Sequence, residues 1–155
     1  MKLLKMITGA TLGVAMLAGS AIAQDPMAGA IGARQSMMRL MGFNIGTLGG
    51  MAQGKIAYDA ATAQAAADNL AKLASLDHTA MFPKGSDDMS VGDTAAKPDI
   101  WENAADFDAK FAALVAGANA MQAAAGGGVD SLKGAMGGLG GACGACHKAY
   151  RTPKN

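Results

Sequence analysis

The chain has 155 residues and a formal net charge of +1, and 51 % of its residues are hydrophobic although only 5 % are aromatic. This length is that of one domain with a modest core. The near-zero charge excludes nucleic acid and an anionic membrane surface as evident partners, and the scarcity of aromatic side chains leaves the core thin.

The start of the chain has the order of a secretory signal peptide. Lys2 and Lys5 precede an apolar run over 6–18, and the motif Ala21-Ile22-Ala23 ends just before Gln24. A charged start, a short apolar segment and an A-x-A site are the three parts of such a signal, and this run is too short to span a bilayer. We therefore expect a cleavable signal over 1–23 and one exported domain over 24–155, without a stable membrane span.

The next segment predicts a long amphipathic helix. Asp25 and Pro26 suit its N-cap and first position, and one face follows at alternating spacings of four and three. This face contains Met27, Ile31, Arg34, Met38, Met41, Ile45 and Leu48. Arg34 is the charged exception, so it needs an anionic partner or must extend its stem to water. The residues over 49–57 predict the break after this helix.

A second helix and a long connection follow. Asp59 is expected to cap an alanine-rich helix that carries Leu70, Leu73 and Leu76. The connection over 77–98 is long enough to cross the end of a bundle. Its acidic residues lack the spacing of an EF-hand loop, so they predict a solvated turn rather than a calcium site; they are Asp87, Asp88 and Asp93. His78 is expected to be a surface or helix-end histidine, with a metal or haem ligand as the alternative.

Two more helical patterns complete the chain. Asp99 as N-cap and Glu102 form an approximate capping box for the third, and 126–128 break the chain before the fourth. The third face contains Phe107, Phe111, Leu114, Ala118 and Met121, and the fourth contains Val129, Leu132, Met136, Leu139, Cys143, Cys146 and Tyr150. Four helices with mostly short connections predict an all-α fold, an antiparallel up-down-up-down four-helix bundle.

The fourth helix ends in the motif Cys143-Gly144-Ala145-Cys146-His147. C-x-x-C-H attaches c-type haem: two thioether bonds form through the cysteines, and the adjoining imidazole binds the iron. A zinc site would need four ligands, which this chain scarcely offers, and a thioredoxin-like pair would start a helix after a strand. A further alternative is that the two cysteines are unmodified thiols packed in the core, but this fits poorly with export to an oxidising compartment. We expect one covalent haem c per chain, with His147 as proximal iron ligand.

Four segments resemble the class II c-type cytochromes, the cytochrome c-prime family. They are ARQSMMRLMG over 33–42, GKIAYDAA over 54–61, KPDIW over 97–101 and CGACHKAYR over 143–151. The resemblance implies a periplasmic bacterial haem protein, often a homodimer through its first two helices. It also implies that Arg34 lies near the haem propionates, that Met38 takes the distal position, and that Arg151 lies beside the proximal histidine.

The resemblance leaves two functions open. A first-helix methionine that ligates low-spin iron would make the chain an electron carrier for a periplasmic redox partner protein, which we place first, with Met38 as distal ligand. An empty distal site would make a five-coordinate, high-spin protein that binds nitric oxide or carbon monoxide, with apolar groups around the iron. Met37, Met38, Met41 and Phe43 are candidates for that lining. An enzyme is the least favoured class, because His78 is the only histidine left for acid-base work.

Overall fold

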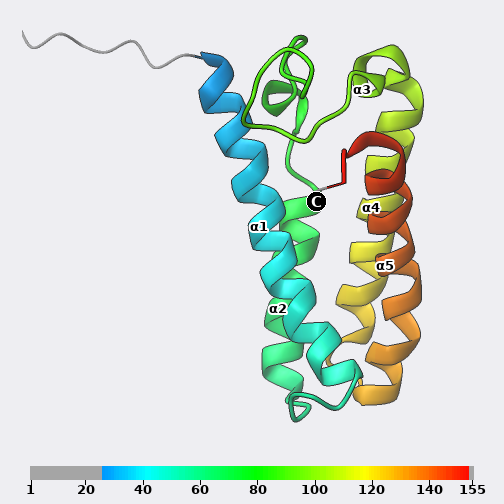
Figure 1. Cartoon of the computed structure of the whole chain (residues 1–155). Coiled ribbons are helices and arrows are strands. Elements are labelled where there is room, and N and C mark those ends of the chain that lie inside the picture. Colours follow the sequence, from blue (N-terminus) through cyan, green and yellow to red (C-terminus); the bar gives the residue numbers. More distant parts are fainter. Residues whose placement is uncertain (1–25, 154–155) are drawn as a thin grey trace, which may run out of the picture.

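The computed structural model describes residues 26–153, and these form a bundle of four long helices (Figure 1). The helices are α1 (Pro26–Ala52), α2 (Ala60–Ala74), the 3-10 helix η1 (Thr79–Met81), the short α3 (Asp99–Glu102), α4 (Ala104–Ala124) and α5 (Val129–Tyr150). Within this range there is no strand, only an isolated bridge between Ala96 and Arg151. No helix among the described residues is long and apolar enough to cross a membrane. The expected signal over 1–23 and the Asp25 cap lie outside the described range.

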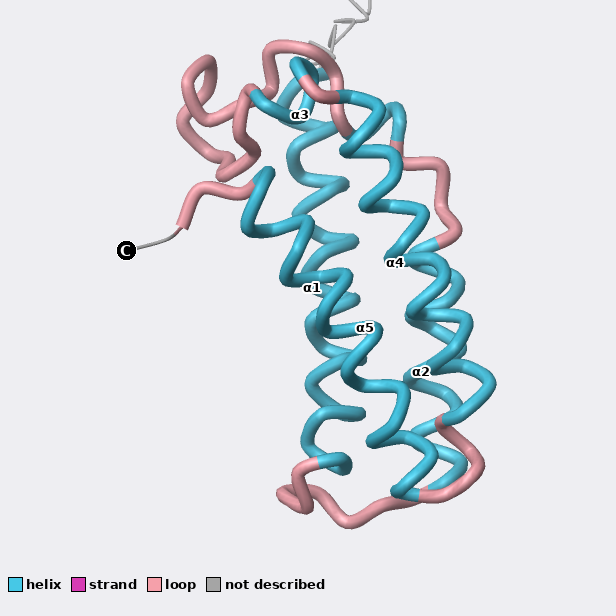
Figure 2. The backbone as a smooth tube through the Cα atoms, turned by 90° about the vertical axis from the view of Figure 1, so that its right-hand side faces the viewer, coloured by secondary structure: helices cyan, strands magenta, loops and turns pink. Residues whose placement is uncertain are grey.

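The long helices alternate in direction, so the predicted all-α, antiparallel up-down-up-down bundle is confirmed. In Figure 1, α1 and α2 form one side and α4 and α5 the other, and Figure 2 shows the loops gathered at the two ends. Leu48, Met121, Leu132 and Leu139 are fully buried between the helices. Ala63, Ala67 and Ala118 are buried among them, because small side chains allow helix backbones to approach closely.

Three predicted helix boundaries were wrong. α2 ends at Ala74, before the predicted Leu76. α1 runs through Gly49 to Ala52, and Gly50 there provides room for a neighbour, since an added Cβ would lie 2.6 Å from Ile56 Cδ1. Asp99 is not an N-cap but lies inside α3, which is capped by Pro98 without a side-chain hydrogen bond. A break at Asn103 then separates α3 from α4.

Side-chain hydrogen bonds tie the connections to the helices. Asp59 caps α2, as predicted, by accepting a bond from Thr62 N at 2.7 Å. The Tyr58 hydroxyl donates to Ala125 O at 2.9 Å and accepts from Gly128 N at 3.0 Å, which joins the two loops at one end of the bundle. These bonds satisfy backbone groups that helix ends leave without partners.

The long connection over 75–98 packs across the other end of the bundle. The Arg34 guanidinium donates to the Met81 carbonyl at 3.2 Å, to Ser86, and to Thr94 Oγ1 at 2.6 Å. The connection also bonds to the end of α5 and the segment that follows it: Lys97 N donates to Tyr150 O, and Thr152 N donates to Ala95 O. The connection is therefore held by α1 from one side and by the C-terminal segment from the other, whereas Met89 at its tip is 83 % exposed.

Candidate haem-binding site

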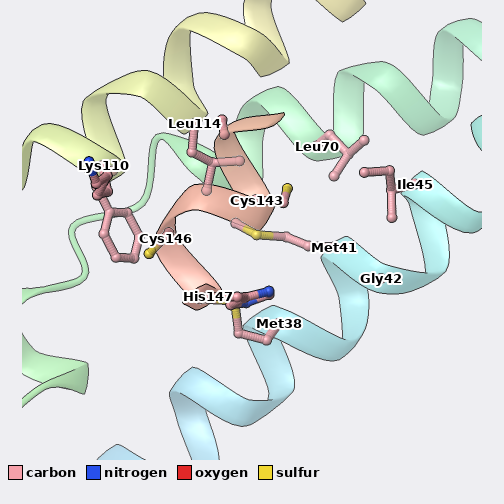
Figure 3. A pocket seen from close by; sticks show the side chains of 12 residues that line it. Met38, Met41, Gly42, Ile45, Leu70, Lys110, Leu114, Cys143, Cys146 and His147 are labelled. Atoms are coloured by element: carbon pink, nitrogen blue, oxygen red, sulfur yellow. The ribbon is translucent and has the colours of Figure 1, made fainter. Parts of the chain in front are cut away.

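An apolar cavity lies between the four long helices (Figure 3). Its volume is about 140 Å³, and it is partly open to solvent. α1 contributes Met38, Met41, Gly42 and Ile45, α2 contributes Leu70, α4 contributes Lys110, Phe111 and Leu114, and α5 contributes Ala142, Cys143, Cys146 and His147. None of these lining residues is a carboxylate.

The helical spacing of α5 places its three reactive side chains on the cavity wall. Cys146 lies three residues after Cys143, and His147 lies four residues after Cys143. All three therefore share one helix face. Burial raises the pKa of both thiols, and at Cys146 the Cys143 thiol adds to this effect. Both cysteines are free and half-buried in the same cavity, as attachment to a single flat group requires.

The protonation state of His147 suits an iron ligand. Burial lowers the pKa of the imidazole, and the positive charge of Arg151 lowers it further. The ring is therefore neutral at pH 7, and a nitrogen lone pair remains free to bind a metal. Two thiols, a neutral imidazole and soft methionine thioethers in an apolar cavity are a donor set that fits the predicted haem c.

Met38 and Met41 reach into the cavity from α1. Figure 3 shows Met38 extending toward His147 and Met41 toward the cysteines. Met37, one position earlier than Met38, is buried in the core, and Phe43 is 73 % exposed. The prediction that Met37 and Phe43 line this cavity was wrong, because the phase of α1 turns both side chains away from it.

Arg34 is not among the residues that line the cavity. Its side chain is 4 % exposed and its guanidinium is engaged by loop oxygens, so the alternative that it extends to water was wrong. The guanidinium also lies over the Phe82 ring, 5.2 Å from its centroid. Burial lowers the pKa of Arg34, while the nearby Asp87 carboxylate raises it. A role of Arg34 toward haem propionates stays a prediction.

Arg151 lies on the outer side of His147. It is exposed, immediately follows α5, and lines a second groove whose other residues are Lys97, His147, Lys148 and Pro153. His147 is the one residue that lines both this groove and the apolar cavity. The predicted position of Arg151 beside the histidine thus agrees with the geometry, whereas its contact with a cofactor stays a prediction.

His78 belongs to an aromatic cluster that the sequence patterns missed. Its ring stacks on Phe111 with centroids 3.7 Å apart and meets Phe82 and Phe107 edge-on. Its Nε2 lies 3.7 Å from Asp108 Oδ1. Because Phe111 also lines the cavity, the cluster supports the cavity wall from behind.

The acidic loop forms a turn, as predicted, but one that is partly buried. Asp87 is 6 % exposed and accepts bonds from Met89 N and from the amide and hydroxyl of Ser90. Among residues 26–153, no group of three histidine, cysteine or acidic side chains could hold a metal ion.

Comparison with known proteins identifies consistent relatives. The family model described as Cytochrome C' matches residues 29–151. Cytochrome c-554 of Cereibacter sphaeroides is 43 % identical over 150 residues, which cover 96 % of this chain and 98 % of the relative. Cytochrome c' of the same species is 35 % identical over 122 residues, covering 79 % and 82 %. The solved cytochrome c' from Rhodobacter Spheriodes superposes with a TM-score of 0.80 at 35 % identity, covering 83 % of this chain and 98 % of that one.

Proposed function

Because the chain belongs to the cytochrome c′ family, we propose that it is a periplasmic one-electron carrier in which His147 and Met38 bind the haem iron from opposite sides. Members of this family are haem proteins of the bacterial periplasm, with haem c attached covalently, and Cys143 and Cys146 are present here for that attachment. Haem supplies an iron atom that gains and loses one electron reversibly.

The chain's own residues would give that iron an apolar setting. Met41, Ile45 and Leu70 line the cavity, and the four long helices hold its walls in place. No carboxylate lines the cavity. Neutral His147 and the uncharged Met38 thioether suit a site that only exchanges electrons.

The position of Met38 is the observation that carries this proposal. Its side chain extends from α1 toward His147 on α5, across the same apolar cavity (Figure 3). A thioether opposite an imidazole is an established low-spin ligand pair that raises the reduction potential, which suits an electron carrier. Methionine is also an adaptable core filler, so ligation must be tested against simple packing.

The test is Met38→Ala, with Met41→Ala as a matched control on the same helix and in the same cavity. Loss of Met38 should remove the methionine-to-iron band at the red end of the ferric spectrum and create carbon monoxide binding. Met41→Ala should keep the band. A wild-type holoprotein that is already high-spin and binds carbon monoxide would refute ligation by Met38.

That outcome would favour the second candidate, a five-coordinate protein that binds nitric oxide or carbon monoxide. The supporting observation is the apolar wall formed by Met41, Ile45 and Leu70, because small neutral gases partition into apolar space. An electron-spin spectrum of the ferric protein, recorded with the carbon monoxide titration, distinguishes the two functions.

We also propose that two chains associate through α1. Leu40 is 53 % exposed and Phe43 is 73 % exposed on this helix, and exposed apolar side chains that lie together can mark an interaction site. One solved relative, 31 % identical to this chain, is described as having a ligand-controlled dimer dissociation. Phe43→Glu should convert a dimer into monomers in sedimentation velocity, whereas Met89→Glu in the loop should not.

A further inference from the structure

The groove outside His147 is strongly cationic, although the whole chain is nearly neutral. Lys97, Lys148 and Arg151 line it, and Lys148 and Arg151 are exposed. The ion pairs among the described residues join other groups, namely His78–Asp108, Lys110–Asp106 and Lys133–Asp130. Two acidic side chains accept hydrogen bonds from this segment: Asp88 from the Thr152 hydroxyl and Asp106 from the Tyr150 hydroxyl. Neither lines the groove, whose lining contains three positive side chains and no negative one.

The backbone fixes this cluster in place. Ala96 pairs with Arg151 in an antiparallel bridge, and Lys97 N donates to Tyr150 O at 3.0 Å. Lys148 is on the last turn of α5. The charges therefore come from two segments that are far apart in sequence but hydrogen-bonded to each other, so they form a fixed surface rather than a mobile tail.

The groove and the haem cavity share a wall. His147 lines both, so a molecule seated in the groove would lie against the residue that we propose as an iron ligand. Electrostatic attraction of an opposite charge to such a face accelerates encounter and orients the partner. A partner held in the groove would thus lie beside a wall of the haem cavity.

We infer that the groove of Lys97, Lys148 and Arg151 is the docking face for a redox protein with an acidic surface. This inference rests on the proposed electron-carrier function. The groove supplies position only: one electron leaves one protein as the other accepts it, and no bond in the chain forms or breaks. An acidic partner is favoured over a neutral one because the charge excess has no ion-pair partner within the described chain.

The test uses the reduced holoprotein and two inorganic oxidants of opposite charge, ferricyanide and tris(phenanthroline)cobalt(III), in stopped-flow mixing. Lys97→Glu combined with Lys148→Glu should slow oxidation by ferricyanide about tenfold at low ionic strength and should speed oxidation by the cobalt complex. Both effects should shrink in 0.5 M salt, because salt screens exposed charges. The reduction potential of each variant is measured so that a change in driving force is not mistaken for a change in encounter.

The matched control is Lys55→Glu combined with Lys133→Glu, which changes the net charge equally through two other exposed lysines. The control should alter either rate by less than about twofold. Equal effects in the two double variants would overturn the docking face. Saturable inhibition by inorganic phosphate at constant ionic strength would identify a small-anion site instead and would also overturn it. The spin state of the wild-type protein tests the proposed function separately, since it does not depend on these lysines.

Discussion

Gly117 should be essential to the spacing of α4 and α5, although it lies outside the haem cavity. A Cβ added there would lie 3.1 Å from Leu139 Cα, 3.5 Å from Leu139 N and 3.6 Å from Gly138 O. Carbon atoms prefer separations of about 3.5–4.0 Å, and Leu139 is fully buried, so its backbone has no free space to retreat into. Gly117→Ala must therefore push the two helices apart.

The expected change in the free energy of unfolding is the sum of two opposed effects. Overpacking a tight contact costs roughly 1–3 kcal/mol, while replacing glycine by alanine within a helix gains roughly 1 kcal/mol. Gly117→Ala should thus destabilise the protein by up to about 2 kcal/mol. Gly134→Ala is the control on α5, because nothing lies within 4 Å of its added Cβ. That variant should show the gain alone.

The assay is guanidinium unfolding of the holoprotein, followed by circular dichroism, with the haem absorption spectrum recorded for each variant. Because both substitutions share the propensity gain, the difference between their midpoints isolates the cost of the contact. We expect Gly117→Ala to unfold at lower denaturant than wild type and Gly134→Ala at higher. If both variants were stabilised equally, the spacing of α4 and α5 would not be limited by the Gly117–Leu139 contact.

Three other predictions follow from the contacts described above. Cys143→Ala with Cys146→Ala should abolish haem that stays on the chain in a denaturing gel, and unchanged haem staining would contradict covalent attachment there. Tyr58→Phe should lower the free energy of guanidinium unfolding by about 1–2 kcal/mol, because Ala125 O and Gly128 N both lose a hydrogen-bond partner; an unchanged midpoint would argue against that tie. Hydrogen bonds from Gln64 and Gln122 lower the pKa of Asp68 below 3.8, so its stabilising contribution is complete above that pH and disappears as the pH falls further. Acid unfolding of Asp68→Asn should accordingly be less steep below pH 4, and an identical acid limb would show that this carboxylate is not linked to folding.

The apolar faces of the helices could be predicted from the sequence, because they depend on the local spacing of apolar residues. Leu132 and Leu139 lie on the face of α5 that is buried in the bundle core, as their spacing indicated. Cys143 and Cys146 continue that face into the cavity. Gly50 misled the boundary prediction, since a glycine that makes room for Ile56 has the same local signature as one that ends a helix.

The features that could not be predicted from the sequence depend on contacts between segments that are far apart in the chain. The pattern of the first helix showed that Arg34 needed partners, but not that its hydrogen bonds go to neutral oxygens in the loop, with the Asp87 carboxylate nearby. His78 packs against Phe111 from beyond the end of α2, and no periodicity connects those two residues. Lys97 joins the groove through a bridge that only the folded chain forms.

The anchoring of the long connection determines where the protein can be labelled. Arg34 holds the connection at Ser86 and Thr94, and the bridge with the C-terminal segment holds it at Ala96. Between these anchors Met89 is exposed, and so are Ser90 and Gly92. A cysteine introduced at Met89 for a fluorophore or an electrode tether would sit on an exposed loop tip, where changes are tolerated, whereas the same label at Ser86 would dislodge the loop from α1.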